Sequence, residues 1–322
     1  MQTDRYSLFA LLREAMRGNT GWKPAWRKAT PAPTYDYVIV GGGGQGLATA
    51  YYLARRYGGQ RIAVVEKGWI GGGNVGRNTT IVRSNYLLPG NEPFYECAMK
   101  LWEGLEQDIN YNAMVSQRGV LNLFHNDAQR GAYIRRGNAM RLHGVDAELL
   151  DTQAVREKVP FLNFDDARFP IRGGLLQRRG GTVRHDAVAW GYARAADRLG
   201  VDIIENCEVT GIRLEGGRAV GVETTRGFIG AGKLGLACAG NSSRVAGMAG
   251  MTEVNDVLPG QGRRRGPVLQ IATAQPVDAR ALREALQDCM PLPPALIRLH
   301  ERTVAPWREA GWQALAPARA AE

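Results

Sequence analysis

Three glycines and one carboxylate carry the clearest chemical signal in this sequence. Gly41, Gly43 and Gly46 occupy the fixed positions of a G-x-G-x-x-G motif, and Glu66 lies twenty positions after Gly46 (66 − 46). In such a motif the first glycine makes a tight turn, the second lets the backbone approach a pyrophosphate, and the third lets a helix pack closely on a strand. An acid at this spacing accepts hydrogen bonds from ribose hydroxyls. The four residues predict a dinucleotide site, with a purely structural turn as the alternative.

The segments around these residues have the patterns of the elements that such a site requires. Residues 35–40 form a short, β-branched apolar run, typical of a buried parallel strand. Residues 47–56 are rich in helix formers, and residues 62–65 predict a second strand that ends at Glu66. The N-terminus of the helix would offer free N–H groups and partial positive charge to phosphates. Because all these parts follow in register, the prediction is stronger than the glycines alone would allow.

A second glycine-rich segment, residues 68–80, follows the acid directly. It also contains Asn74, Arg77, Asn78 and Thr79, whose amide, guanidinium and hydroxyl groups hydrogen-bond to polar ligands. We expect a loop wrapped around the ligand, with backbone amides and Arg77 facing phosphates. An ordinary glycine-rich connection is the alternative, but the position of the loop after the ribose-binding acid favours ligand contact.

The rest of the chain contains both helical and strand patterns. Residues 6–28 predict an amphipathic helical arm packed on its own domain or on a partner subunit, with a helix on a membrane surface as the alternative. An apolar strand over residues 233–240 is expected to return to the nucleotide-binding layer and to place Gly240 against the cofactor. We also predict helices over residues 93–111, 128–143, 147–159 and 186–199, strands over 119–124, 174–177, 201–204 and 208–212, and a hairpin of 218–225 with 227–230.

Composition narrows the class of protein. The chain has 322 residues, of which 44% are hydrophobic, enough for one large domain or two ordinary ones. Its net charge of +10 comes mostly from scattered arginines, with no aromatic–basic interleaving, zinc pattern or helix-turn-helix signal, which argues against nucleic acid as a partner. No apolar run is long enough to cross a bilayer, and charges interrupt the short apolar runs near the N-terminus, unlike a signal peptide.

The cysteines indicate a reducing compartment. Cys97, Cys207, Cys238 and Cys289 lie far apart and form no C-x-x-C pair. This spacing suits buried thiols better than a disulfide framework or a metal site. We therefore expect a cytoplasmic protein with no metal site and no membrane partner.

Longer runs of the sequence match one group of proteins. The matching runs are residues 6–9, 38–44, 46–54, 66–69, 77–81, 83–87, 116–120, 185–186, 188–190 and 206–211. In these runs the chain resembles the beta subunits of heterotetrameric sarcosine oxidases, within the D-amino-acid-oxidase-like flavoproteins. The resemblance covers roughly residues 5–250 and is specific, because the glycine motif alone would indicate only a dinucleotide.

The resemblance implies two flavins: a non-covalent FAD, and an FMN between this chain and an alpha subunit. In that family the FMN is covalently attached to a histidine, whose position is occupied here by His185; considered alone, a histidine that begins a helix is more often a cap or a packed polar group. The resemblance also implies that Val209 contacts the adenosine side through its backbone and that Gly240 lines the cofactor. The residues expected to wrap the pyrophosphate and flavin side are Asn74, Arg77, Asn78 and Thr79.

The implied reaction is the oxidation of the secondary amine sarcosine. A hydride leaves the N-methyl group for FAD, and the resulting imine becomes glycine and a formaldehyde equivalent. Electrons then pass through FMN to dioxygen, which becomes hydrogen peroxide. The flavins carry this chemistry, while the protein supplies orientation and electrostatics. The sequence identifies no general base, and His125, His143 and His300 gain no support from the resemblance.

The resemblance stops near residue 251. Gln45 stands where the family often has histidine, at a variable position of the motif. Residues 252–322 contain no lysine, tyrosine or phenylalanine, yet they hold eight of the fifteen prolines. We find there neither the strands nor the glycine-rich loop that the family should have, and the amphipathic segments 278–289 and 294–315 predict helices. This tail would be a surface extension or, alternatively, a replacement domain.

The sequence therefore predicts an α/β fold, with a Rossmann-type FAD-binding domain and an interleaved, incomplete mixed-sheet substrate domain. Residues 1–34 form an arm and linker, 35–90 and 185–250 the FAD-binding parts, 91–184 a helical and substrate-domain part, and 252–322 the atypical tail. Three functions compete: a sarcosine-oxidising subunit, a flavin oxidoreductase for another small amine or amino acid, and a truncated non-catalytic flavin-binding subunit.

Overall fold

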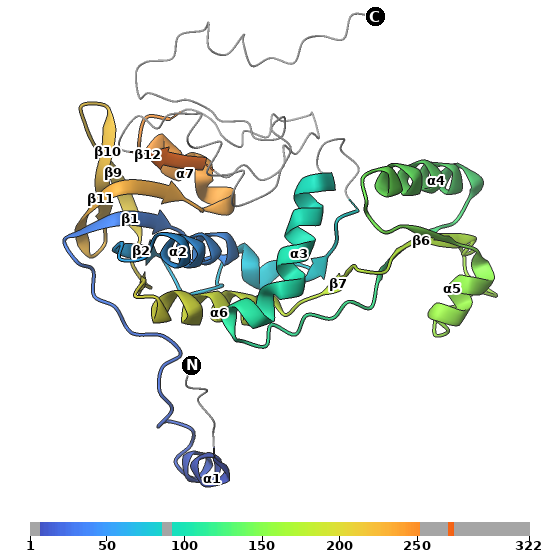
Figure 1. Ribbon diagram of the computed structural model, residues 1–322, viewed down its shortest axis with the longest axis horizontal. Helices are drawn as coiled ribbons and strands as arrows, with labels where there is room; N and C mark the ends of the chain where they lie inside the picture. The colour runs from blue at the N-terminus through green and yellow to red at the C-terminus, as the bar shows by residue number, and fades with distance from the viewer. Residues whose placement is uncertain (1–6, 86–91, 252–269, 274–322) are drawn as a thin grey trace, which may run out of the picture.

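A seven-stranded sheet dominates the computed structural model, which describes residues 7–85, 92–251 and 270–273 (Figure 1). The strand order is β8-β2-β1-β11-β10-β9, and β12 also pairs with β11. Strands β8, β2, β1 and β11 run parallel, whereas β10, β9 and β12 are antiparallel to their neighbours. The bounds are β1 (Thr34–Val40), β2 (Ile62–Val65), β8 (Asp202–Ile204), β9 (Val209–Glu215), β10 (Arg218–Thr224), β11 (Gly227–Leu236) and β12 (Gln270–Thr273).

Helices cover both faces of the parallel strands, which explains why these strands are apolar throughout. On one face Ile39 packs with buried residues of α2 (Gly44–Tyr57) and α6 (His185–Arg198). On the other face Val38 and Val40 pack with Val245 and other buried residues around α7 (Ser242–Gly247). Burial on two faces is typical of parallel sheets and produces the continuous apolar run of β1.

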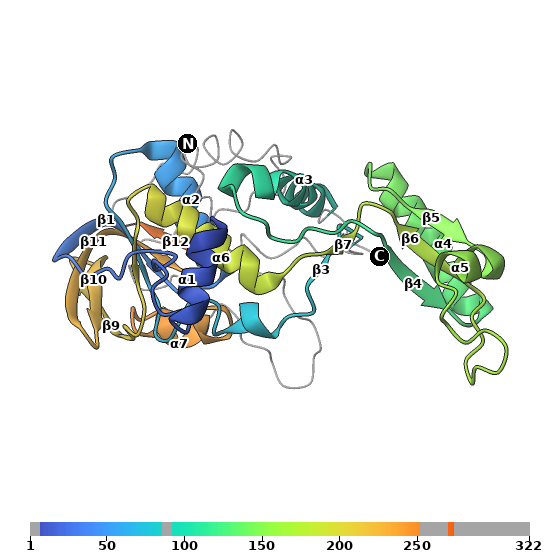
Figure 2. The same cartoon turned by 90° about the horizontal axis from the view of Figure 1, so that it is seen from below.

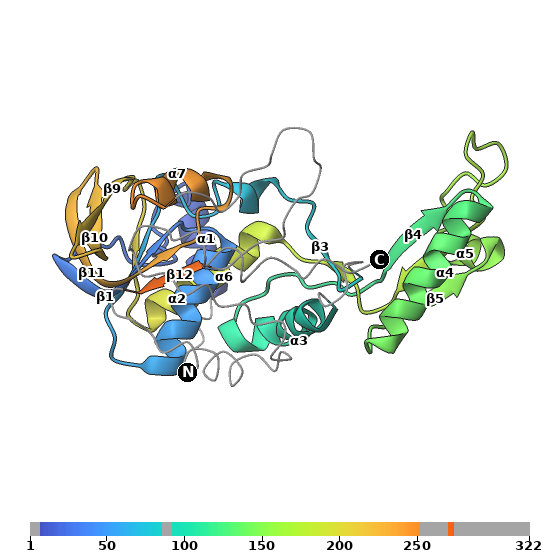
Figure 3. The same cartoon turned by 90° about the horizontal axis from the view of Figure 1, so that it is seen from above.

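Two further helices accompany this sheet. Helix α3 (Glu92–Ile109) lies beside α6 (Figure 3). Its Met99 and Leu105 belong to the core that contains residues of α2 and α6. Helix α1 (Leu8–Met16) stands away from the sheet at the end of an N-terminal arm (Figure 1). None of the described helices combines the length and the apolar character that crossing a bilayer requires.

A separate three-stranded antiparallel sheet lies at the other end of the molecule (Figure 2). Its order is β4-β6-β5, with β4 (Val120–Phe124), β6 (Gly173–Gln177) and β5 (Glu148–Leu150). Helix α4 (Asp127–Leu142) packs on the face with Leu175, and α5 (Thr152–Lys158) packs on the face with Leu176. A two-stranded ladder of β3 (Ile81–Val82) and β7 (Gly181–Thr182) lies between the two larger sheets (Figures 2 and 3).

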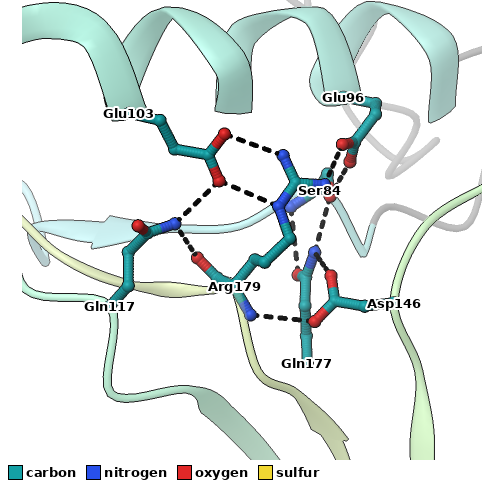
Figure 4. Close-up of polar contacts among 7 residues, drawn as sticks. All are labelled: Ser84, Glu96, Glu103, Gln117, Asp146, Gln177 and Arg179. Atoms are coloured by element: carbon teal, nitrogen blue, oxygen red, sulfur yellow. Dashed lines mark hydrogen bonds and ion pairs between the residues drawn. The ribbon is translucent and has the colours of Figure 1, made fainter.

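One arginine joins the three-stranded sheet to α3 (Figure 4). The Arg179 guanidinium forms an ion pair with Glu96 and binds both oxygens of Glu103, with Nε–Oε1 2.8 Å and Nη2–Oε2 3.0 Å. The hydrogen bond to Glu103 is the largest influence that raises the pKa of the Arg179 guanidinium. Arg179 lies just after β6, and both acids lie on α3. These three residues, here called the Arg179 clasp, therefore connect the two parts of the fold.

A buried glutamine extends this connection. The Gln177 amide exchanges hydrogen bonds with Ser84: its Nε2 donates to Oγ at 2.6 Å, and its Oε1 accepts from the backbone N–H at 3.1 Å (Figure 4). Gln177 Nε2 also donates to Asp146 at 3.2 Å. Both Gln177 and Ser84 are fully buried, so their polar atoms must be paired within the protein.

The structure corrects several predictions of secondary structure. The helix predicted over residues 147–159 is wrong at its start, since residues 148–150 form β5 and the helix begins only after Asp151, whose side chain caps it. The hairpin strand 227–230 and the strand 233–240 are one continuous strand, β11, that ends at Leu236. The helix of the 6–28 arm ends at Met16.

The tail also differs from its prediction. No strand was expected after residue 251, yet β12 pairs with β11 from Lys233 to Leu236. An open edge of β11 accounts for this, because β10 covers only the first part of that strand, up to Gly230. The predicted helices over 278–289 and 294–315 lie outside the described residues.

Candidate functional site

The glycine-rich turn between β1 and α2 is packed so closely that side chains are excluded from it. Gly41 has a φ of +113°, and a Cβ there would lie 2.4 Å from the Ala237 carbonyl oxygen. A Cβ on Gly46 would lie 1.9 Å from the Gly41 carbonyl oxygen. Gly43, by contrast, precedes α2 without any side-chain cap, and only Val75 lies near its Cβ position, at 3.6 Å. Two glycines therefore allow close packing, while Gly43 leaves the N-terminus of α2 without a side-chain cap.

The carboxylate of Glu66 is fixed beside this turn. It directly follows β2, and its Oε2 accepts the Gly42 N–H at 2.8 Å while Oε1 accepts the Gly68 N–H at 2.9 Å. Each carboxylate oxygen has a second acceptor position. Glu66 is thus oriented by the backbone and retains the capacity to accept hydrogen bonds from the hydroxyls of a ligand.

The loop after Glu66 folds over the N-terminus of α2. The Gly71 N–H donates to the Gly42 carbonyl at 3.4 Å, and Val75 approaches the glycine turn from the short helix η1 (Asn74–Arg77). Asn78 stabilises the end of the loop, because its Nδ2 donates to the Val75 carbonyl at 2.8 Å and its Oδ1 accepts the Thr80 N–H at 2.7 Å. The predicted ligand-wrapping loop is therefore located over the helix end that would meet a phosphate.

The polar side chains of this loop remain exposed. Asn74, Arg77, Asn78 and Thr79 all face solvent, and Arg77 forms no ion pair with any residue in the described part of the chain. A guanidinium without an internal carboxylate is available to an external anion. These four residues belong to the loop whose Gly71 and Val75 contact the glycine turn.

The end of β11 lies against the end of β1, as the sequence predicts. The two strands pair in parallel, and the Ala237 N–H donates to the Val40 carbonyl at 2.8 Å. The Cys238 thiol donates to the same carbonyl at 3.3 Å, and burial raises its pKa to about 11, which keeps it protonated. Gly240 follows in the exposed turn η2 (Ala239–Asn241), with no atom within 4 Å of its Cβ position.

Val209 is the buried first residue of β9. The backbone shortly before β9 is hydrogen-bonded to the segment that begins at Glu66. The Cys207 N–H donates to the Glu66 carbonyl at 2.9 Å, and the Asn206 N–H donates to the Gly68 carbonyl at 2.8 Å. These bonds bring the chain entering β9 to the ribose-binding acid that the sequence predicts.

His185 begins α6 close to the other end of the loop. The Val183 N–H donates to the Thr80 carbonyl at 3.1 Å, and Ala189 of α6 packs 3.9 Å from the Cβ position of Gly71. The His185 ring is half-buried, and its Nδ1 is buried without a hydrogen-bond partner in the described residues. Buried polar atoms are usually hydrogen-bonded, so this ring nitrogen has the capacity for a further partner.

The residue after this histidine carries a charge. Burial raises the pKa of Asp186, but the hydrogen bonds from Arg184 and from the Ala187 N–H outweigh it and lower the pKa below its usual value. Asp186 is therefore ionised at neutral pH and places a negative charge at the start of α6, where it is favourable.

Sequence reasoning missed one acid of this region, Glu205. Its Oε1 accepts the Ile70 N–H at 2.8 Å, and its Oε2 accepts the Trp26 indole N–H at 3.3 Å. Glu205 thereby ties the N-terminal arm to the loop after Glu66. The signal was present, because Glu205 follows the buried strand β8 just as Glu66 follows β2.

The residues present fit an FAD. The N-terminus of α2 has no side-chain cap, the turn before it excludes side chains, and Glu66 retains acceptors at the end of the next parallel strand. These are the three requirements for a pyrophosphate and a ribose in a doubly wound sheet. The orphaned Nδ1 of His185 fits a second polar or covalent contact.

A family model covers most of the chain. Residues 36–309 match the model described as "FAD dependent oxidoreductase" (DAO). The match extends beyond residue 251, where the specific resemblance in the sequence stops.

Three curated relatives are proteins named "Sarcosine oxidase subunit beta". The protein from Rhizobium meliloti is 74% identical over 247 residues, covering 77% of this chain and 59% of that protein. The protein from Rhodobacter capsulatus is 52% identical over 246 residues, covering 76% and 59%. The protein from Arthrobacter is 52% identical over 226 residues, covering 70% and 56%. The chain thus spans less than three fifths of the length of each relative.

Solved structures share the fold. The L-proline dehydrogenase from P. horikoshii has a TM-score of 0.64 at 24% identity, over 70% of this chain and 58% of that one. The glycine oxidase from Geobacillus kaustophilus has a TM-score of 0.63 at 22% identity, over 69% of this chain and 60% of that one.

Proposed function

Because this chain belongs to the FAD dependent oxidoreductase family, we propose that it acts as a beta-type subunit in the oxidation of sarcosine. The overall reaction consumes sarcosine, water and dioxygen and yields glycine, formaldehyde and hydrogen peroxide. The observation that carries the FAD-binding part of the proposal is the position of Glu66, bound by the Gly42 and Gly68 N–H groups beside the N-terminus of α2, which has no side-chain cap. High identity to sarcosine oxidase beta subunits supports the choice of substrate.

The chain's own residues would bind and orient the FAD. Gly41, Gly43 and Gly46 give the pyrophosphate access to the end of α2, and Glu66 accepts hydrogen bonds from the ribose. When bound, the flavin supplies the hydride acceptor for the oxidation of a carbon–nitrogen bond. The remaining contacts are assigned to Asn74, Arg77, Asn78 and Thr79 on the pyrophosphate and flavin side, and to Val209 and Gly240 along the cofactor.

His185 would hold the second flavin, FMN, through a covalent bond. Its buried and unpaired Nδ1 supports this role, as does its place at the end of the loop that contains Arg77. The FMN would lie between this chain and an alpha subunit, and dioxygen would be the final electron acceptor. Among the described cysteines, Cys97, Cys207 and Cys238 are free thiols, which suits a cytoplasmic location.

The test is to measure flavin before and after acid denaturation of the assembled protein. We expect released FAD together with flavin that stays on a peptide containing His185. The variant His185→Asn should lose the peptide-bound flavin and keep the released FAD. His143→Asn, an exposed histidine after α4, is the matched control and should leave both unchanged. Flavin that remains attached to peptide after acid denaturation of His185→Asn would contradict the assignment.

A substrate panel tests the choice of amine. Sarcosine should give peroxide faster than other N-methyl amines, glycine or proline; a faster reaction with another amine would identify an oxidoreductase of the same family with a different substrate.

A second candidate is a subunit that binds flavin without turnover. One observation favours it, since the described substrate side is only a three-stranded sheet. Tight FAD binding with no peroxide from any amine would establish that candidate.

A further inference from the structure

Helix α1 exposes the apolar side chains that an ordinary surface helix would bury. Its large apolar side chains are exposed, whereas the buried residue is Glu14. At 3.6 residues per turn the apolar side chains form one continuous face, roughly 160° wide. The exposed fractions in this face, here called the α1 apolar face, are Leu8 77%, Phe9 82%, Leu11 48%, Leu12 57% and Met16 76%.

The polar side of α1 is already in use by the arm. The Glu14 side chain accepts from Arg13 at 3.2 Å and covers the backbone at Gly21, where a Cβ would lie 2.2 Å from Oε2. The Asn19 N–H donates to the Glu14 carbonyl at 2.7 Å. The arm therefore folds against the polar side of its own helix and leaves the apolar face directed outward.

The helix is also capped and attached. Ser7 Oγ accepts the Ala10 N–H at 3.1 Å at its start. Further along, Arg27 Nε donates to Asp197 at 2.8 Å, and Trp26 donates to Glu205. A helix of nine residues is marginal in water by itself, so most of its stability must come from packing of its apolar face. In the described chain nothing covers that face.

Size and charge indicate which kind of partner covers it. A stable dimer buries about 800 Å² per partner, more than five side chains of one short helix can provide. The face must therefore supplement a larger contact. A second copy of this chain would carry the same net charge of +10, which opposes self-association. A different polypeptide that makes a larger contact elsewhere on this chain would satisfy both conditions.

We propose that the α1 apolar face docks into an apolar groove on another subunit of the same enzyme. Leu8, Leu12 and Met16 have the i, i+4, i+8 spacing of anchors in helix-in-groove recognition, and Phe9 lies beside them. The inference rests on the proposed function, because it takes the alpha subunit as the partner.

The test compares two double variants of the full chain. Leu8→Ser with Leu12→Ser removes two anchors. Leu142→Ser with Leu199→Ser removes two leucines that are exposed elsewhere, at 86% and 47%, and serves as the control. Each chain is mixed with purified alpha subunit, and the dissociation constant is measured. We expect the α1 variant to bind at least about tenfold more weakly, and the control to bind like the wild type. Both variants should melt like the wild type when alone.

Three results would overturn the docking role. One is an α1 variant that binds the alpha subunit with wild-type affinity. Another is a wild-type chain that dimerises through this face in the absence of the alpha subunit, with the α1 variant remaining monomeric. The third is binding of the wild type, but not of the α1 variant, to phosphatidylglycerol–phosphatidylcholine vesicles while subunit affinity is unchanged. A wild-type chain that binds no alpha subunit at all would contradict the proposed assembly itself, and the docking role with it.

Discussion

The two sheets of this protein are stabilised in different ways. The seven-stranded sheet lies between two hydrophobic cores, of which one contains 22 buried residues and the other 15. The three-stranded sheet has clusters of only four and three buried residues in the described chain. Its connection to the rest of the molecule is polar, through the Arg179 clasp and the buried Gln177–Ser84 pair.

The seven-stranded sheet is therefore stabilised by its own hydrophobic cores, whereas the three-stranded sheet depends on its polar contacts with the rest of the molecule. Hydrophobic burial is non-directional and increases with the area removed from water, so the nucleotide-binding sheet tolerates local changes at its surface. A polar clasp depends on the geometry of a few groups, and the loss of one partner leaves the others unpaired. The nucleotide side should therefore unfold as one unit, whereas the three-stranded sheet should be released by single changes at the clasp.

The largest effect is expected from Gly46→Ala, which disturbs the seven-stranded sheet where α2 packs most closely on the turn after β1. The new Cβ would overlap the Gly41 carbonyl oxygen, so α2 would have to move away from β1. We expect a loss of about 3 kcal/mol of stability and loss of bound FAD, measured by urea denaturation and by flavin content. Gly44→Ala is the control, because its Cβ would meet only Val75, at 3.6 Å. Wild-type FAD content in Gly46→Ala would refute this packing argument.

Arg179→Gln should come next and should act on the three-stranded sheet alone. It leaves Glu96 and Glu103 without their cation, and since the arginine is 34% exposed we expect about 1–3 kcal/mol. Hydrogen exchange should accelerate in β4, β5 and β6 and remain unchanged in β1 and β2. The neighbouring Arg178→Gln, whose ion pair with Glu148 is at the surface, should change stability by less than about 0.5 kcal/mol. Equal effects in both sheets would contradict their independence.

Glu66→Gln should affect ligand binding more than the stability of either sheet. Its amide oxygen can accept only one of the two backbone N–H groups that Glu66 now binds, those of Gly42 and Gly68, and the charge-assisted bonds to ribose are lost. We expect FAD to bind about tenfold more weakly, equivalent to about 1.4 kcal/mol, by fluorescence titration. Asp36→Asn, an acid that accepts the Arg61 N–H away from the turn, should bind FAD normally. Unchanged affinity in Glu66→Gln would remove its role at the ribose.

The smallest effect is a pH dependence confined to the clasp. The hydrogen bond from Arg179 is the largest influence that lowers the pKa of Glu103 below its usual 4.5. A lowered pKa means that this contribution to stability is complete at neutral pH and is lost as the pH falls through 4.5 and below. The protection of the three-stranded sheet, measured as exchange relative to the intrinsic rate at each pH, should therefore fall on acidification, and less so in Glu103→Gln. The same acid response in both proteins would show that other groups control it.

The strand–turn–helix–strand unit around the glycine motif was predictable from local sequence. The positions of Gly41, Gly46 and Glu66 within it follow from short-range spacing, and the flanking strands are apolar throughout as two-sided burial requires. The return of the 233–240 segment to the same layer was also predictable, since an apolar run ending in glycine has few other places in such a fold. The glycine motif and its flanking strands lie within one contiguous segment, where local preference and final structure agree.

Strands β5 and β12 and the Arg179 clasp depend on contacts between distant segments, which the local sequence does not reveal. Residues 148–150 look helical in sequence but pair with β6, and β12 exists because the distal part of β11 has an open edge. A strand is stable only with a partner, and that partner is supplied by a distant segment. The Arg179 clasp was invisible for the same reason, because its acids lie about eighty positions upstream, and no local pattern marks which of many arginines will meet them.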